Sequence, residues 1–342
     1  MVSLLLMLKR FIIIIALLLV AASAATGLFI RHMAHYAKTP VSEEAGSPVE
    51  VKVEPGQSFR AVSDKLLEEE LIEHPLKFRI LAAYQKATTK IKAGEYRISG
   101  TMTPDQILGQ LSEGRVVLHP LTVAEGLNIY QVAENAARAD LCTAQEFTDA
   151  ATDPELLESI GVPAKTVEGY LFPETYFFEK PVSPETIIRT MVSRFKSVFS
   201  DSWKQRAKDL GFSVHETVTL ASIIEKETGV EGERKIISSV FHNRLEKGMR
   251  LETDPTVIYG IKDFDGNLTR KDLRNPTPYN TYTNFGLPPG PIANPGKASL
   301  EAALYPADTD FLFFVARPDK THHFSTNLKE HNRAVRKYQL NR

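Results

Sequence analysis

One glutamate of the chain stands where its spacing would let it transfer a proton. A capping box that begins at Ser213 predicts a helix, and the helical pattern stops near Gly229. Leu220 and Ile224 belong to the apolar stripe of this helix, and Glu227 occupies the next position on that stripe. Burial disfavours the charged form of a carboxyl and raises its pKa. Because such a glutamate can protonate a glycosidic oxygen near neutral pH, Glu227 is the candidate catalytic acid.

Glu225 is the other acidic side chain near the end of this helix and is the secondary candidate. It lies roughly 200° around the helix axis from Glu227, so we expect it to face water. A structural role for Glu227 is an alternative, in which this helix-end carboxylate pairs with a cation such as Arg234. Helix geometry alone leaves both interpretations open.

Side chains that could bind a sugar follow this helix. The segment from Asp254 to Gly296 is crowded with Gly, Pro, Asn, Thr and Tyr and is too long for a simple connector. Long loops in compact domains are usually functional or disordered, and the aromatic residues of this one favour order. Tyr rings stack on sugar faces and Asn and Asp bind hydroxyl groups, although all three also serve structural roles in loops. The candidates to line a substrate cleft are Tyr259, Tyr279, Asn280, Tyr282, Asn243 and Asp254.

Other catalytic chemistries lack their motifs in this chain. There is no H-E-x-x-H, no G-x-S-x-G and no P-loop, and His322, His323 and His331 lack the helical i, i+4 spacing of a zinc site. Cys142 is the only cysteine, which excludes an intramolecular disulfide and a cysteine-rich metal site. We therefore expect no metal ion and no cofactor.

Composition and charge narrow the class of partner. The chain has 342 residues, of which 43% are hydrophobic and 24% are charged, so most of it can bury a core. The net charge of -1 at pH 7 gives no basic excess of the kind that binds nucleic acid. We therefore expect no nucleic-acid partner.

One segment near the N-terminus is long and apolar enough to cross a membrane. The run from Phe11 to Ile30 carries no charge, and as a helix it would span the roughly 30 Å hydrocarbon core of a bilayer. Lys9 and Arg10 precede it, which favours a cytoplasmic N-terminus. A cleaved signal peptide is the alternative, because the small residues 21–24 resemble an A-x-A cleavage site. Either interpretation exports the rest of the chain.

The remaining patterns divide the chain into a small module and a larger domain. Residues 1–10 form a short cytoplasmic segment before the transmembrane helix at 11–30, and residues 31–47 are polar without a period and predict a linker. Residues 48–118 predict a strand, two helices, a strand and a third helix. Residues 119–342 predict a larger domain with the glutamate-bearing helix and the long loop. The expected fold class is therefore α+β.

Four segments closely resemble the sequences of the YceG-like family, the endolytic murein transglycosylases. They are LASIIEKETGVEGERKIISSVFHNRLEKGMRLETDPTVIYG (Leu220 to Gly260), EGYLFPETYFF (Glu168 to Phe178), YNTYTNFGLPPGPIANPG (Tyr279 to Gly296) and HHFSTNLKEHN (His322 to Asn332). The resemblance covers nearly the whole chain, including the single N-terminal anchor.

The resemblance implies an activity and a location. Members of this family are anchored in the inner membrane, with a periplasmic catalytic domain that acts on the glycan strands of peptidoglycan. They cleave the MurNAc–GlcNAc β-1,4 bond within strands and leave a 1,6-anhydro-MurNAc end. They act beside peptidoglycan synthases and are thought to terminate nascent strands. The resemblance also makes residues 48–118 a LysM-like module, and it assigns the catalytic role to the Glu-Thr pair Glu227-Thr228, the same glutamate that the helix pattern selects.

Two other functions remain open at the level of sequence. A true hydrolase of the same polymer would need a second carboxylate near Glu227, which Glu168, Glu174 or Asp254 would have to supply. A non-catalytic glycan-binding scaffold would use the LysM-like module and the anchor. Product chemistry distinguishes the hydrolase from a transglycosylase, because only the transglycosylase leaves anhydro ends. Substitution of Glu227 distinguishes the scaffold, which would keep its function in Glu227→Gln.

Overall fold

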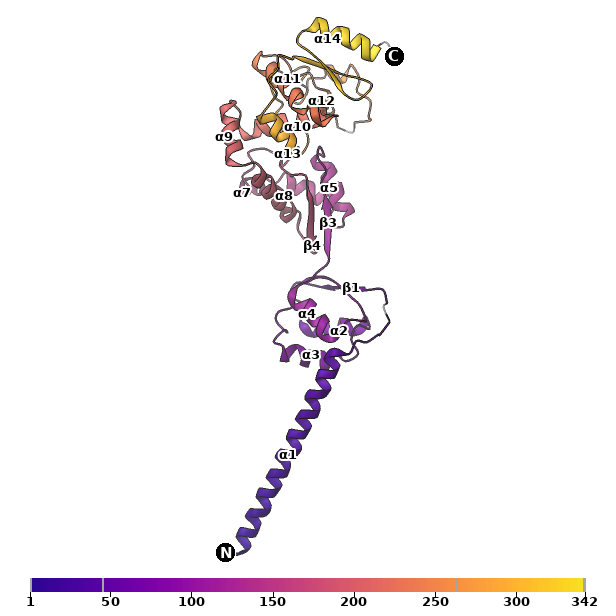
Figure 1. The fold of residues 1–342 in the computed structure, drawn as a ribbon, viewed down its shortest axis with the longest axis vertical. Coiled ribbons are helices and arrows are strands. Elements are labelled where there is room, and N and C mark those ends of the chain that lie inside the picture. Colours follow the sequence, from indigo (N-terminus) through magenta and orange to yellow (C-terminus); the bar gives the residue numbers. More distant parts are fainter. Residues whose placement is uncertain (1, 45, 263, 341–342) are drawn as a thin grey trace. The chain divides into compact units, whose positions relative to one another are not determined.

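The computed structural model describes residues 2–44, 46–262 and 264–340 (Figure 1). It is 51% helical and 8% strand, so the expected mixture of helices and strands with an N-terminal apolar helix is confirmed. The chain divides into two compact units. The first runs to Leu118 and includes Glu179–Pro181, and the second comprises His119–Phe178 and the residues from Val182 onward.

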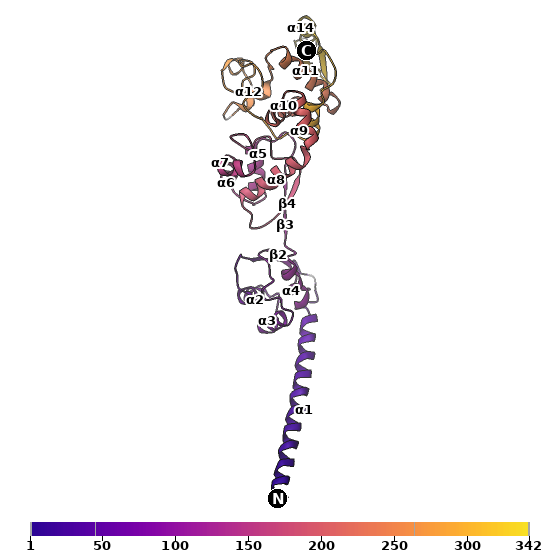
Figure 2. The ribbon, with the colours of Figure 1, turned by 90° about the vertical axis from the view of Figure 1, so that its left-hand side faces the viewer.

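The N-terminal helix α1 spans Val2–Lys38 and is longer than the predicted transmembrane segment. Its portion Met7–Lys38 is apolar and long enough to cross a membrane. The prediction that an irregular linker begins at residue 31 is wrong, because the helix continues to Lys38 before it reaches Pro40. The reason is tertiary packing: Ala37 is buried in the core of the first unit, where the last turns of α1 meet α3 and α4 (Figures 1 and 2).

The first unit has the predicted order of strand, two helices, strand and helix. Its elements are β1 (Val49–Val53), α2 (Phe59–Glu68), α3 (Pro75–Tyr84), β2 (Gly94–Ile98) and α4 (Pro104–Glu113). The two strands are antiparallel, with Val49 opposite Ile98 and Val53 opposite Gly94. Alternate residues of both strands point into a core that the three helices complete, as the period of two along a strand requires.

The second unit contains the remaining helices and two short two-stranded sheets. Its helices are α5 (Ile129–Arg138), α6 (Ala144–Ala151), α7 (Pro154–Ser159), α8 (Pro184–Val198), α9 (Asp201–Asp209), α10 (Val214–Glu227), α11 (Arg234–Glu246), α12 (Asp254–Tyr259), α13 (Lys297–Leu304) and α14 (Leu328–Val335). Strand β3 (Leu118–Thr122) pairs with β4 (Thr175–Glu179), and β5 (Phe313–Ala316) pairs with β6 (His322–Ser325). Short helical turns lie at Glu231–Glu233, Asp272–Arg274 and Arg336–Leu340.

Helix α10 forms the centre of the second unit. The predicted capping box is present, since Ser213 accepts from the backbone of Glu216 and the Glu216 side chain accepts in return. Every residue from 217 to 224 is buried, and α10 packs most extensively on α13 (Figure 1). A helix that is buried on all sides has a fixed position, so the side chain at its C-terminal end, Glu227, is held by the core.

The close approach of the loop at Gly169 to α10 gives a test of this packing. Gly169 has φ +83°, and a Cβ there would lie 2.5 Å from Pro291 Cγ and 2.8 Å from Val218 Cγ1. Gly211 is a matched control in the same unit, because it has φ +80° and a Cβ there would meet nothing within 4 Å. We expect Gly169→Ala to lower the free energy of unfolding by about 2 kcal/mol more than Gly211→Ala, through overpacking. Equal losses in denaturant unfolding of the full chain would contradict this packing.

Candidate active site

Glu227 ends α10 and faces a cavity of about 510 Å³. Leu220, Ile223 and Ile224 are fully buried behind it, so the apolar stripe ends where the carboxyl begins. The start of α12, strands β5 and β6 and helix α14 form the other walls. The polar residues that line the cavity are Glu227, Arg244, Glu252, Asp254, Tyr282, His322, His331, Asn332 and Gln339. A cavity with many hydrogen-bonding groups and one half-buried carboxyl suits a hydroxylated substrate.

The surroundings of Glu227 raise the pKa of its carboxyl above the usual value. Burial is the largest cause and favours the neutral form. The hydroxyl of Thr253 donates a hydrogen bond to Oε1 and opposes this shift, whereas the negative charge of Asp254 adds to it. The positive charge of His322 opposes it again. The net effect raises the pKa of this carboxyl, which favours the protonated form that a proton donor requires.

Two of the predicted cleft residues meet Glu227 in this cavity. The hydroxyl of Tyr282 donates to Asp254 Oδ1 at 2.6 Å, and both side chains line the cavity with Glu227. Burial raises the pKa of Tyr282, so this phenol keeps its proton. The pair therefore presents a fixed negative charge close to the candidate acid.

Several side chains of the cavity were not selected from the sequence. Arg244 lies in the last turn of α11. In the structure it is buried, and its guanidinium donates to the carbonyls of Leu251 at 2.9 Å and Leu312 at 2.6 Å. His322, considered only as a metal ligand, holds Glu233 Oε2 at 2.7 Å through Nδ1. The one signal for His322 was its place in the HHFSTNLKEHN segment.

Of two other predicted cleft residues, Tyr279 lines a different cavity and Tyr259 packs against Tyr279. Tyr259 and Tyr279 pack with ring centroids 4.9 Å apart, and the Tyr259 hydroxyl donates to Glu168 Oε2 at 3.0 Å. Tyr279 and Glu168 line a second cavity of about 660 Å³ together with His215. Glu168 is 2% exposed, and burial raises its pKa to about 7 although the Ile129 backbone donates to it.

The two asparagines among the candidates hold loops together. Asn280 is fully buried, and its amide donates to the carbonyls of three loop residues, Asp272, Leu273 and Asn275. Asn243 donates to the carbonyls of Thr309 at 2.7 Å and Phe311 at 2.9 Å. Their amide donors are thus committed to backbone carbonyls, which corrects the expectation that they line the cleft.

The expectation that Glu225 faces water is wrong. Its side chain is 8% exposed and lies 3.9 Å from Arg234, and it accepts a hydrogen bond from the backbone of Gly296 at 3.0 Å. The helix period gave its direction correctly, but the loop before α13 covers that side of α10. Arg234 therefore pairs with Glu225, so the pair between Arg234 and Glu227 that would have given Glu227 a structural role is not formed.

Known proteins share most of this sequence. Residues 51–337 match the model of the YceG-like family. The chain belongs to the YceG-like family. It is 36% identical over 318 residues to a Bacillus subtilis protein named endolytic murein transglycosylase, covering 87% of each chain. A Streptococcus pneumoniae protein of the same name is 29% identical over 330 residues, covering 86% of this chain and 59% of the relative. A crystal structure of a YceG-like protein from Listeria monocytogenes is 37% identical, with a TM-score of 0.60, and the match covers 84% of this chain and 98% of that one.

The family membership predicted from the four sequence segments is therefore confirmed. Those segments surround the two cavities. Leu220–Gly260 contributes Glu227, Glu252 and Asp254 to the first cavity, and the segment that begins at His322 contributes part of its opposite wall. Segments distant in this YceG-like sequence thus meet around one carboxyl.

The role of Asn280 generates a prediction about the long loop. Replacing Asn280 with Asp or Ala removes both amide donors, so three carbonyls lose their buried partner. We expect faster backbone hydrogen exchange between residues 269 and 284, measured by mass spectrometry, with unchanged exchange in α10. The exposed Asn267→Ala is the control. Unchanged exchange in both Asn280 variants would show that this amide does not order the loop.

Proposed function

We propose that this chain is an endolytic lytic transglycosylase that cleaves the β-1,4 bond between MurNAc and GlcNAc within peptidoglycan strands. Two relatives that span most of the chain are named endolytic murein transglycosylases. The main structural support is the half-buried carboxyl of Glu227, which has a raised pKa and lies in a cavity lined by polar side chains.

The proposed reaction uses one carboxyl twice. Protonated Glu227 donates its proton to the glycosidic oxygen, O4 of the leaving GlcNAc, as the bond to C1 of MurNAc breaks. The resulting carboxylate then accepts the proton of the C6 hydroxyl of the same MurNAc, whose oxygen bonds to C1. The product is a 1,6-anhydro-MurNAc end, and no water is consumed. Proximity favours the C6 hydroxyl, because it belongs to the reacting sugar.

The neighbours of Glu227 adjust its proton affinity. Burial and the negative charge of Asp254 raise the pKa of this carboxyl, and the Thr253 hydroxyl stabilises the carboxylate that forms. The hydrolase alternative needs a second carboxylate that activates water. Glu174 forms a 2.5 Å ion pair with Arg194, and Glu168 is buried against the second cavity, which leaves Asp254 as the candidate for that role. Because Asp254 accepts from Tyr282, we assign it the electrostatic role.

The first unit gives the enzyme its proposed location. We propose that α1 crosses the inner membrane once, with Lys9 and Arg10 on the cytoplasmic side and the catalytic domain, residues 119–342, in the periplasm. Residues 48–118 are proposed to be a LysM-like glycan-binding module, supported by the order β1, α2, α3, β2 with the two strands antiparallel. An enzyme held there would meet nascent strands beside the peptidoglycan synthases and would terminate their elongation.

Digestion of purified peptidoglycan by the full chain in detergent tests the proposed acid. We expect Glu227→Gln to lower the rate of anhydro-end formation at least about 10²-fold, since the amide cannot donate the proton. Glu225→Gln, on the same helix, is the matched control and should keep most of the activity. Products are identified by mass spectrometry. Full activity of Glu227→Gln would contradict the assignment and would favour the scaffold alternative or another acid.

The pH dependence of kcat/KM tests how Asp254 and Thr253 affect the pKa of Glu227. Glu227 must be protonated to donate, so activity falls as pH rises through its pKa. Asp254→Asn removes a charge that raises this pKa, so we expect the basic limb of the pH profile to move to lower pH. Thr253→Val removes a hydrogen bond that lowers it, so the basic limb should move to higher pH. If the basic limb moved in the same direction in both variants, the result would contradict these roles of Asp254 and Thr253.

A further inference from the structure

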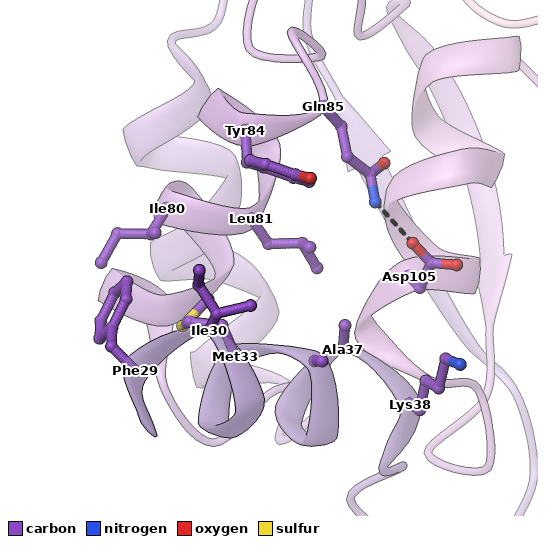
Figure 3. Close-up of a pocket in the computed structure, with 11 residues that line it drawn as sticks. Phe29, Ile30, Met33, Ala37, Lys38, Ile80, Leu81, Tyr84, Gln85 and Asp105 are labelled. Atoms are coloured by element: carbon purple, nitrogen blue, oxygen red, sulfur yellow. Dashed lines mark hydrogen bonds between the residues drawn. The ribbon is translucent and has the colours of Figure 1, made fainter. Parts of the chain in front are cut away.

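A groove of about 340 Å³ lies in the first unit, where the end of α1 packs beside α3 and α4 (Figure 3). Its two ends differ in chemistry. Phe29, Ile30 and Ile80 lie at one end, and Lys38 and the hydrogen-bonded pair of Gln85 and Asp105 lie at the other (Figure 3). The groove is therefore amphipathic along its length.

The direction of this polarity matches the direction of a membrane. Phe29 and Ile30 end the apolar run of α1. Lys38 lies on the same helix, about 13 Å beyond Phe29 along the helix axis. If the run from Phe11 to Ile30 fills the hydrocarbon core, the rest of the helix crosses the zone of lipid headgroups. The apolar end of the groove then opens toward the hydrocarbon and the polar end lies among the headgroups.

The rim of the groove is unusually apolar for a surface in water. Phe29 is 51% exposed, Ile30 61% and Tyr84 87%, and all three line the groove (Figure 3). Exposed apolar side chains gathered around a groove mark an interaction site. A tyrosine at this depth suits the membrane interface, where its ring and its hydroxyl meet different surroundings.

The polar end offers one charge of each sign. Lys38 is exposed and cationic. Asp105 is exposed and anionic, and it accepts a 2.6 Å hydrogen bond from the Gln85 amide, which fixes its orientation. A headgroup that carries a phosphate and an ammonium group complements this pair, with the phosphate on Lys38 and the ammonium on Asp105. A purely anionic headgroup would be repelled by Asp105.

We propose that this groove binds one phospholipid with a zwitterionic amine headgroup, taken from the leaflet next to the first unit. An acyl chain lies along Met33, Ile80 and Leu81, and the headgroup lies between Lys38 and Asp105. The bound lipid holds the first unit against the membrane surface. This inference rests on α1 as a membrane span and is independent of the reaction at Glu227.

Native mass spectrometry of the full chain tests the proposal. The protein is reconstituted in vesicles with equal amounts of phosphatidylethanolamine, phosphatidylglycerol and phosphatidylcholine, extracted in a mild detergent, and weighed with its retained lipid. We expect one retained phosphatidylethanolamine per chain. Ala34→Trp fills the groove and should reduce this retention about fivefold, whereas the adjacent His35→Trp, on the same exposed helix but outside the groove, should not.

Charge variants test the headgroup. Lys38→Gln should lower retention of phosphatidylethanolamine about fivefold, and Asp105→Asn should remove its advantage over phosphatidylglycerol, as loss of a single exposed charge pair implies. Both positions are exposed, so these variants are expected to fold, which a thermal melt checks. Equal retention of all three lipids by the wild type, a preference for phosphatidylglycerol, or undiminished retention by Ala34→Trp would each overturn the proposal.

Discussion

The second unit depends on one unfavourable placement: a carboxyl held at the edge of a desolvated core. An isolated carboxylate in such surroundings is costly, and it responds by taking up a proton more readily. Helix α10 can hold Glu227 there because residues 217–224 are buried on every side and fix the helix. The Thr253 hydroxyl limits the cost by donating to the carboxylate form. The proposed donation of a proton by Glu227, and its later acceptance of one, depend on that balance.

Irregular segments lie between the helices and strands of the second unit, and polar side chains hold these segments in place. Buried carbonyls need donors whether or not they belong to a helix or strand. Asn280 supplies donors to three carbonyls of the long loop, and Arg244 supplies them to the carbonyls of Leu251 and Leu312. The hydroxyl of Ser222, in the middle of α10, accepts from the backbone of Ile292 and ties the loop to the central helix. Buried polar side chains thus tie the loops of the second unit to its core.

Features that depend on neighbouring residues along the chain, such as the start of a helix and the face on which a side chain lies, could be predicted from the sequence. The capping box at Ser213 fixed the start of α10, and the helical period placed Glu227 at the end of the apolar stripe. The family membership followed from long sequence segments. The direction of Glu225 was also correct, but its burial depends on the loop at Gly296, which the period of one helix does not contain.

The remaining differences have the same origin. The roles of Asn243 and Asn280 depend on carbonyls that approach from other parts of the chain, so residue type alone could not separate loop-holding from sugar-binding amides. Tyr259 and Tyr279 pack around Glu168, beside a second cavity that no spacing in the sequence announces. Helix α1 continues past the apolar run because its last turns are buried against the first unit.

The central claim is that one carboxyl serves as acid and then as base, with the C6 hydroxyl of MurNAc in the place of water. Digestion of peptidoglycan in water enriched in oxygen-18 tests it most directly, because the two chemistries differ in the origin of one oxygen atom. The account predicts new 1,6-anhydro ends that contain no oxygen-18. Reducing ends that carry one oxygen-18 atom would contradict it, and they would identify a hydrolase in which Asp254 or another carboxylate activates water.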